Sequence, residues 1–378
     1  MRSRAALPIL LLALALPLNA QAPGAEKITN GVLDSLHPTV GLFIVDGDEC
    51  TATLIGCRTV LTAAHCICGD HLGGPKCSAR TDLVTPADKF VFFPNAGLFA
   101  LSSLAVDPAY NGYTGASDLA ILHLASPVTN IAASPLNRTG FPDLGLPGVI
   151  VGYGSTHTDS TDDGLKRQGN VKTAACDPPA DGFVCWNFKK PLGTPGLNSD
   201  TCFGDSGGPL FLTFRGKTVL AGVTSSGTND ECAPLDNSFD ADVFTNLAWI
   251  QAEGGADLSS ATCGEGPQIG DPGTTVLATS SSLSRRHPQN ASTLQVPPGT
   301  AELRVALNIA DWFDNTVALY IRHGALASPT AFDCKSDAPS GQQFCIVKNP
   351  APGLWSVLAT RTGGPGGGYQ VTATLIGR

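Results

Sequence analysis

An all-β fold is predicted by the way in which short apolar runs and turn residues alternate along the chain. The runs are rich in Val, Ile, Leu, Phe and Thr, and their spacing suits antiparallel barrels or sandwiches. The sequence also contains 43 Gly and 28 Pro among 378 residues, a share that favours turns over helices. A chain of this length predicts about two domains, each able to bury its own core.

The amino terminus has the order of charged, apolar and small residues that is typical of a secretory signal. Two arginines fall within the first four residues, the run LPILLLALALPL follows, and Ala20-Gln21-Ala22 ends the segment. We therefore expect residues 1–22 to be a signal peptide that is cleaved after Ala22. The apolar run is too short to span a bilayer comfortably. The sequence predicts a soluble protein that is secreted to the extracellular space or the periplasm.

The charge and the cysteines narrow the classes of partner. The formal net charge of -9 argues against nucleic acid, because binding to phosphate requires a basic face. It disfavours an anionic membrane surface for the same reason.

Twelve cysteines in an exported chain indicate disulfides before metal ligands or redox centres. The sequence has no paired C-x-x-C clusters of the zinc type, and we predict no cofactor and no metal.

The apolar runs fall into two groups. The first group lies between residues 39 and 226 and consists of TVGLFIV, CTATLIG, RTVLTAA, FVFFP, LAILHL, GVIVGYG, GFVCWNF, PLFLTF and KTVLAGVTSS. A helix is expected over TNLAWIQAE at 245–253, followed by a linker at 264–274 in a Gly- and Pro-rich stretch. Beyond it, AELRVALNI, TVALYIRHG, QFCIV, GLWSVLAT and YQVTATLIG predict a separate β domain over residues 275–378.

The stretch DTCFGDSGGPLF at 200–211 places Ser206 directly after Asp205 and within a ring of three glycines. One interpretation is a surface turn, since Gly, Asp and Ser tolerate unusual backbone angles. The other is a nucleophile held against exposed backbone N–H groups, because glycine lets substrate and backbone approach closely. The stretch alone does not decide between them.

A serine nucleophile needs a general base, and the base needs a group that fixes its tautomer. His65 in VLTAAHC follows small residues at the end of a strand and precedes a cysteine that could clamp its loop. A lone histidine is more often packed or simply exposed. Asp118 in SDLAIL leads into an apolar strand, where an unpaired carboxylate is costly. A histidine N–H would supply the missing bond.

Taken together, LTAAHC, DLAIL and GDSGGP in this order resemble a serine protease of the trypsin/chymotrypsin family. The resemblance covers roughly residues 28–254. It implies a domain at 28–263 with two six-stranded antiparallel barrels, a C-terminal helix, and the triad His65, Asp118 and Ser206 at the barrel interface. It implies a serine endopeptidase acting on protein or peptide substrates. The N–H groups of Gly204 and Ser206 would form the oxyanion hole.

The same resemblance implies an activation step. EKITNG at 26–31 is similar to the site where cleavage after Lys27 frees the α-amine of Ile28 to pair with Asp205. Residues 23–27 would then be a short activation peptide, and an activating protease a partner. The alternative is an ordinary tail followed by the start of a strand. We predict a zymogen.

The resemblance also implies which residues form the substrate pocket, position by position. Asp200 falls at the pocket base, where an acid selects Arg or Lys, and Ser225 with Gly227 falls on the strand that aligns the substrate backbone. Two departures are Ser226, where the family usually has tryptophan, and Asp242, which aligns with a pocket-wall position across a variable loop. A second acid there would strengthen the preference for cations or distort the pocket.

The resemblance also implies disulfide pairs. It pairs Cys50 with Cys66, Cys176 with Cys185, and Cys202 with Cys232. Cys334 and Cys345 are the one pair available within the second domain. For the remaining four we expect Cys68 with Cys77 as a local loop, and Cys57 with Cys263, because the family's C-terminal helix packs near the turn that carries Cys57. Sequence alone does not fix these last two.

Residues 275–378 resemble the bacterial pre-peptidase C-terminal domain, a small β-sandwich, in VALYIRHG, FDCKS, QQFCIV and GLWSVLA. DNTVALY lacks the acidic turn that this family often has, so we expect no metal there.

A different class of function stays open: a protease-shaped, non-catalytic binding module, whose sandwich does the binding. The intact His65, Asp118 and Ser206 favour an enzyme. We expect a monomer.

Overall fold

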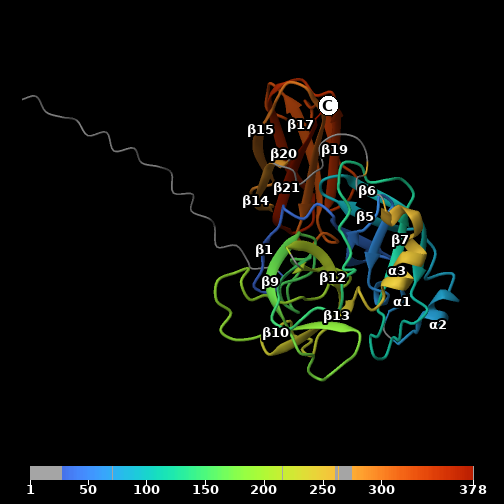
Figure 1. The fold of residues 1–378 in the computed structure, drawn as a ribbon. Coiled ribbons are helices and arrows are strands. Elements are labelled where there is room, and N and C mark those ends of the chain that lie inside the picture. Colours follow the sequence, from blue (N-terminus) through green and yellow to red (C-terminus); the bar gives the residue numbers. More distant parts are fainter. Residues whose placement is uncertain (1–27, 70, 215, 260–262, 264–274, 378) are drawn as a thin grey trace, which may run out of the picture.

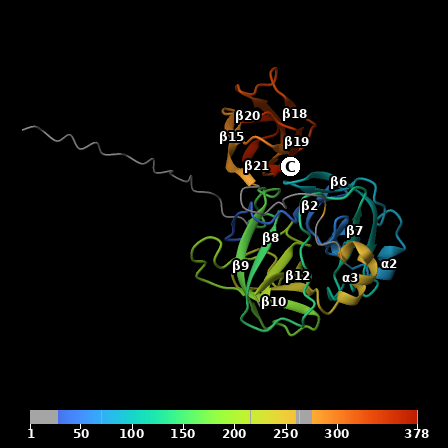
Figure 2. The same cartoon turned by 45° about the horizontal axis from the view of Figure 1, so that its top comes forward.

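The computed structural model describes residues 28–69, 71–214, 216–259, 263 and 275–377. The predicted signal peptide, the activation peptide with Lys27, and the linker at 264–274 lie outside the described residues. Figures 1 and 2 show two barrels side by side, with a sandwich, coloured orange to red, stacked against them. The predicted all-β class, with two six-stranded antiparallel barrels, a C-terminal helix and a further β unit, is confirmed.

The first barrel is closed in the order β2-β3-β4-β7-β6-β5. Its strands are β2 (Val40–Val45), β3 (Asp48–Leu54), β4 (Thr59–Thr62), β5 (Lys89–Phe93), β6 (Gly97–Val106) and β7 (Ala120–Leu124). Asp46 and Gly47 connect β2 to β3 with φ values of 51° and 87°. Two left-handed residues suit the tight turns of hairpins. Inside the barrel, Phe43, Leu54, Val91 and Leu122 are among the buried core residues.

The second barrel is formed by six strands in the order β9-β10-β13-β12-β11-β8, closed by the pairing of β8 with β9, and the short strand β1 adds to β9 outside the ring. Its strands are β1 (Val32–Leu33), β8 (Pro147–Gly152), β9 (Arg167–Ala174), β10 (Phe183–Phe188), β11 (Pro209–Phe214), β12 (Lys217–Ser226) and β13 (Asp236–Asp242). The helix α3 (Leu247–Gly254) and the 3₁₀ turn η1 (Gly255–Ser259) follow it. The helix therefore lies within about two residues of its predicted bounds, the usual uncertainty at helix ends.

Two short helices were not predicted. They are α1 (His65–Cys68) and α2 (Gly74–Ser78). Helices of four and five residues are too short to show an apolar period in the sequence. The Cys50–Cys66 and Cys68–Cys77 disulfides hold them in place.

The C-terminal unit is a sandwich of two four-stranded antiparallel sheets. One sheet has the order β14 (Thr275–Ser284), β21 (Gly366–Gly377), β16 (Thr300–Ile309) and β19 (Gln342–Lys348). The other has the order β15 (Gln289–Val296), β20 (Gly353–Gly363), β17 (Thr316–His323) and β18 (Cys334–Ser336). The Cys334–Cys345 disulfide joins β18 to β19 and so connects the two sheets.

All six expected disulfides are present, with Cα–Cα distances from 5.2 to 6.3 Å. Cys57–Cys263 spans 206 residues and anchors the chain beyond α3 to the first barrel. Bridges of this kind stabilise mainly by restricting the unfolded chain, and more so for long loops. None of the helices in the described residues has the length and hydropathy needed to cross a bilayer.

Candidate active site

Strand pairing in the first barrel brings His65 and Asp118 together. Strand β4 pairs with β7, and Thr62 at the end of β4 lies opposite Ala120 at the start of β7. The chain leaves β4 three residues before His65 and enters β7 two residues after Asp118. The two side chains therefore meet beyond the same end of one strand pair.

Asp118 fixes the imidazole of His65 with both of its carboxylate oxygens. Its Oδ2 lies 2.7 Å from His65 Nδ1, and its Oδ1 accepts the backbone N–H of His65 at 2.8 Å. Ser225 Oγ donates a third bond to Oδ2 at 2.7 Å. With a proton on Nδ1, the neutral ring presents Nε2 as an acceptor. The carboxylate is only 2% exposed, so its bonds replace the water that burial removes.

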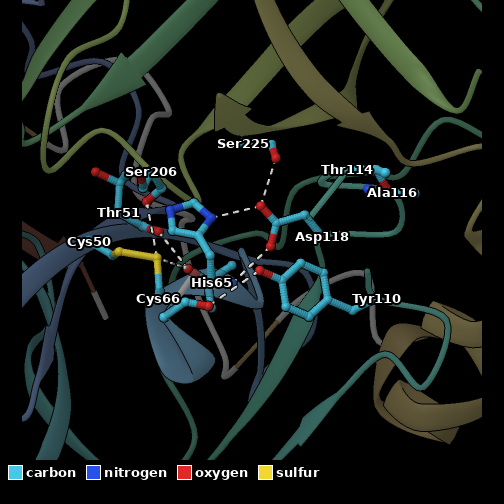
Figure 3. Close-up of polar contacts among 12 residues, drawn as sticks. Cys50, Thr51, His65, Cys66, Tyr110, Thr114, Ala116, Asp118, Ser206 and Ser225 are labelled. Atoms are coloured by element: carbon cyan, nitrogen blue, oxygen red, sulfur yellow. Dashed lines mark hydrogen bonds and ion pairs between the residues drawn. A yellow bond between two sulfur atoms is a disulfide. The ribbon is translucent and has the colours of Figure 1, made fainter. Parts of the chain in front are cut away.

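Ser206 lies on the other side of the imidazole. Figure 3 shows the ring of His65 between Asp118 and Ser206. The serine is held by its backbone: its carbonyl accepts Thr51 N–H at 2.8 Å, and Gly207 N–H donates to Thr224 at 2.9 Å. Gly207 has a φ of 80°, and a Cβ there would lie 2.1 Å from Thr62 Oγ1, so glycine is required.

Asp205 points away from this triad into the protein. Its Oδ1 accepts Gly154 N–H at 2.8 Å, and its Oδ2 accepts Cys202 N–H at 2.9 Å. Burial raises the pKa of Asp205 to about 7, although these two bonds and the charge of Arg167 act in the opposite direction. The loop of the nucleophile is thereby tied to residue 154 of the second barrel.

Arg167 is a buried cation that was not selected from any pattern in the sequence. It begins β9 and is fully buried, and it donates to the carbonyls of Asp162 at 2.8 Å and Gly154 at 3.4 Å. Burial lowers the pKa of its guanidinium to about 10, and the neighbouring carboxylates of Asp162 and Asp205 partly oppose this shift. Arginine at the start of a strand is usually exposed, so only the packing identifies it.

The residues that follow Lys27, after which cleavage is expected from the sequence, are part of the fold. Ile28 is fully buried with Trp186 and Leu210, and Thr29 pairs with Asp200. Ile28 has a φ of 40°, which is a strained value for a β-branched residue. Thr29 Oγ1 donates to the carbonyl of Cys232 at 3.2 Å.

A cavity of about 680 Å³ opens beside the triad. Ser206, Ser225 and Gly227 line it, as expected from the sequence. Gly204 lines it too, while the first barrel contributes His65, Cys50, Cys66, Asp46, Asp48 and Glu49. The sulfurs of Cys50 and Cys66 lie close to His65, but they are joined to each other and offer no thiolate for a metal.

Several acids line the cavity, and the one that lies beside Asp200 is Asp236, which was not selected from the sequence. Its Oδ1 accepts the N–H of Thr228 at 2.6 Å and the hydroxyl at 2.8 Å. Asp200 lies one layer deeper and is fully buried; Ser238 Oγ donates to its Oδ1 and lies 3.2 Å from Asp236 Oδ2. Burial raises the pKa of Asp200 well above its usual value, and the neighbouring charge of Asp236 adds to this.

The position expected for Asp242 is wrong: among the described residues of the cavity lining, Asp242 has no place. Its carboxylate instead accepts Thr245 N–H at 2.7 Å and Phe244 N–H at 3.3 Å, in the turn before α3. Asp236 and Asp242 are the two ends of β13, and six residues of strand span about 20 Å.

Comparison with known proteins places the matched region on the two barrels. The Trypsin family profile matches residues 33–250. Brachyurin from Leptuca pugilator is 31% identical over 252 residues, covering 61% of this chain and 97% of the relative. Trypsin from Saccharopolyspora erythraea is 29% identical over 205 residues, covering 50% and 82%.

A third relative carries a different name: the inactive snake venom serine proteinase 13 of Crotalus adamanteus is 30% identical over 237 residues, covering 57% of this chain and 81% of that protein. The family match ends before the sandwich begins at β14. It covers more than half of the chain and coincides with the barrels that carry the triad. The chain belongs to the trypsin family of serine proteases.

Proposed function

We propose that the chain is a secreted serine endopeptidase that hydrolyses peptide bonds with Ser206, His65 and Asp118. The observation that carries the proposal is the bond of 2.7 Å between His65 Nδ1 and Asp118 Oδ2, at the wall of a cavity that Ser206 also lines. Orientation by a buried carboxylate is what a histidine general base requires. Membership of a family with secreted relatives and the six disulfides fit an oxidising compartment.

In this mechanism His65 Nε2 takes the proton of Ser206 Oγ as the hydroxyl attacks the substrate carbonyl. The same proton passes to the departing amine, and an acyl-enzyme is left. Water then attacks the acyl carbon with His65 again as base, and the serine is regenerated. Asp118 stays ionised throughout and stabilises the imidazolium.

The N–H groups of Gly204 and Ser206 would bind the oxyanion that forms at each attack. Gly204 has a φ of 91°, a left-handed value that glycine adopts without strain. A single such donor is worth a few kcal/mol in the transition state.

Substrates with Arg or Lys before the scissile bond are proposed, because the pocket is acidic. Asp236 would meet the cation, with Asp200 behind it. Asp240, near Asp200, is also fully buried, and burial raises its pKa well above the usual value. A neutral side chain would leave the Asp236 carboxylate without a counter-ion, which typically costs 2–5 kcal/mol.

The chain is proposed to be a zymogen. Cleavage after Lys27 would release the α-amine of Ile28, a residue already packed in the core near Asp200. An ammonium group reaching Asp205 would neutralise a carboxylate whose burial is otherwise unfavourable.

Labelling by a serine-reactive fluorophosphonate tests the proposal against a protease-shaped binding module. We expect one label per cleaved chain, located on Ser206, and none on the Ser206→Ala variant. Folded, cleaved wild-type protein that takes up no label contradicts an enzymatic function.

A further inference from the structure

The sandwich is docked on the catalytic domain through buried polar contacts. Arg304 of β16 donates to the carbonyls of Asn95 at 3.3 Å and Thr129 at 3.1 Å. Asn95 in turn donates to Thr374 Oγ1 at 2.9 Å. Asn95 and Arg304 are 1% and 4% exposed, so these bonds are made without access to bulk water. An interface with satisfied buried groups favours one fixed arrangement of the two parts.

Trp312 of the sandwich contacts Glu49, a residue that lines the cavity. It lies in the turn after β16, and its indole N–H donates to the Glu49 carboxylate. Glycines flank it: a Cβ at Gly164 would lie 2.8 Å from its Cδ1, and one at Gly341 would lie 2.6 Å from its Cβ. The ring packs in the same apolar cluster as Tyr153 of the second barrel.

Glu49 also contacts the loop that carries Gly204 and Ser206, which we call the oxyanion loop. It is the second residue of β3, it is buried, and it lines the same cavity as Ser206. A Cβ at Gly204 would lie 2.6 Å from Glu49 Oε1, so the carboxylate is packed against the backbone of that glycine. Trp312, Glu49 and Gly204 therefore form a continuous line of contact from the sandwich to the loop of the nucleophile.

A second line of contact reaches the other side of the same loop. Asp311 N–H donates to the carbonyl of Asp163 at 3.1 Å, beside Gly164. Gly164 N–H donates to the carbonyl of Tyr153. Gly154, which follows Tyr153 in the chain, donates its N–H to Asp205. The residues adjoining Trp312 thus support the segment that binds the carboxylate of Asp205.

We propose that Trp312 is a positioning residue for catalysis, which holds the oxyanion loop through Glu49, so that the sandwich is a working part of the enzyme. This inference rests on the proposed serine endopeptidase function. Oxyanion donors act only if they are aimed before the transition state forms. A loop released at Gly204 has to be ordered during each turnover, which lowers kcat while leaving ground-state binding in the pocket unchanged.

The test compares Trp312→Phe with Trp355→Phe in the full-length, cleaved enzyme. Trp355 is a matched control: it is buried in the sandwich core, and its indole N–H donates to the carbonyl of Ala351 at 2.9 Å, within the sandwich. Active sites are counted with fluorophosphonate, and kcat and KM are measured on a short peptide amide. We expect kcat to fall about tenfold in Trp312→Phe, less than the loss of a whole oxyanion donor, with KM unchanged. Trp355→Phe should keep the wild-type kcat.

A double-mutant cycle with Glu49→Ala makes the test specific to this contact. Glu49→Ala should lower kcat about as much as Trp312→Phe, and the double variant should lose no more than either, because all three break one line of contact. Glu49→Ala alone decides the matter if Trp312→Phe does not fold. Full kcat in either single variant, additive losses, or an equal loss in Trp355→Phe would overturn the inference. Absence of labelling in wild type would instead overturn the proposed function.

Discussion

Asp236 is the residue proposed to select the substrate side chains that enter the pocket, because it lines the cavity and Asp200 is buried beside it. Asp236→Asn should reduce the preference for Arg and Lys by at least tenfold in kcat/KM, since a desolvated ion pair is lost. Asp200→Ser should reduce it as well, because Asp200 and Asp236 share the Ser238 hydroxyl and the change removes one partner of that contact. The measurement is a panel of peptides that differ only in the residue before the scissile bond.

Asp242→Asn is the control for that experiment. It changes the same functional group on the same strand, but at the end that faces α3. The preference of Asp242→Asn for Arg and Lys should equal that of the wild-type enzyme. A wild-type enzyme that prefers Phe, Leu or Ala would contradict the proposed specificity while leaving the peptidase function intact.

At the scale of elements, the segment that starts at Ile28 carries a prediction of its own. The active species should begin at Ile28, because only a free α-amine can become the counter-ion of Asp205. N-terminal sequencing of the fluorophosphonate-labelled species measures this directly. Asp205→Asn should weaken activity at least tenfold without preventing the cleavage. Full activity in a species that begins at Pro23 would contradict activation by cleavage after Lys27.

Most elements that carry the site were predictable, because strand runs and the residues around His65, Asp118 and Ser206 are continuous in the sequence. The two short helices and the position of Asp236 were not. The helices depend on disulfides rather than on periodicity. Asp236 and Asp242 are the two ends of one strand, and which end meets the cavity depends on strand packing that the sequence does not show. Arg167 and the contact of Trp312 with Glu49 depend on long-range packing that no local pattern records.

At the scale of the whole molecule, buried carboxyl groups predict how stability depends on pH. Burial raises the pKa of Asp205 to about 7, and it raises those of Glu49, Asp200 and Asp240 as well. Between its pKa in the unfolded chain and its raised pKa in the folded chain, each group holds a proton that the unfolded chain has released, and for Asp205 this range runs from about pH 4 to 7. The free energy of unfolding should therefore fall as pH rises, by up to about 1.4 kcal/mol per pH unit for each group.

Chemical denaturation of the uncleaved Ser206→Ala variant at pH 4.5 and pH 7 measures this slope without self-digestion. Asp205→Asn should flatten it, because a neutral amide removes one titrating group. Asp34 acts in the opposite sense, but its pKa is lowered to about 2, so the stability it contributes is lost only below about pH 4. A free energy of unfolding that rises from pH 4.5 to 7 would contradict the assignment of these groups as protonated.

Peptide hydrolysis by Ser206→Ala and His65→Ala tests the central claim most directly. Both variants should stay folded, since neither side chain fills the core, and each should lose several orders of magnitude in kcat, because a nucleophile and its base act as one unit. Asp118→Asn should lose nearly as much through the wrong tautomer of His65. If Ser206→Ala, freed of any contaminating protease, hydrolyses peptides at a substantial fraction of the wild-type rate, the triad is not the catalytic centre.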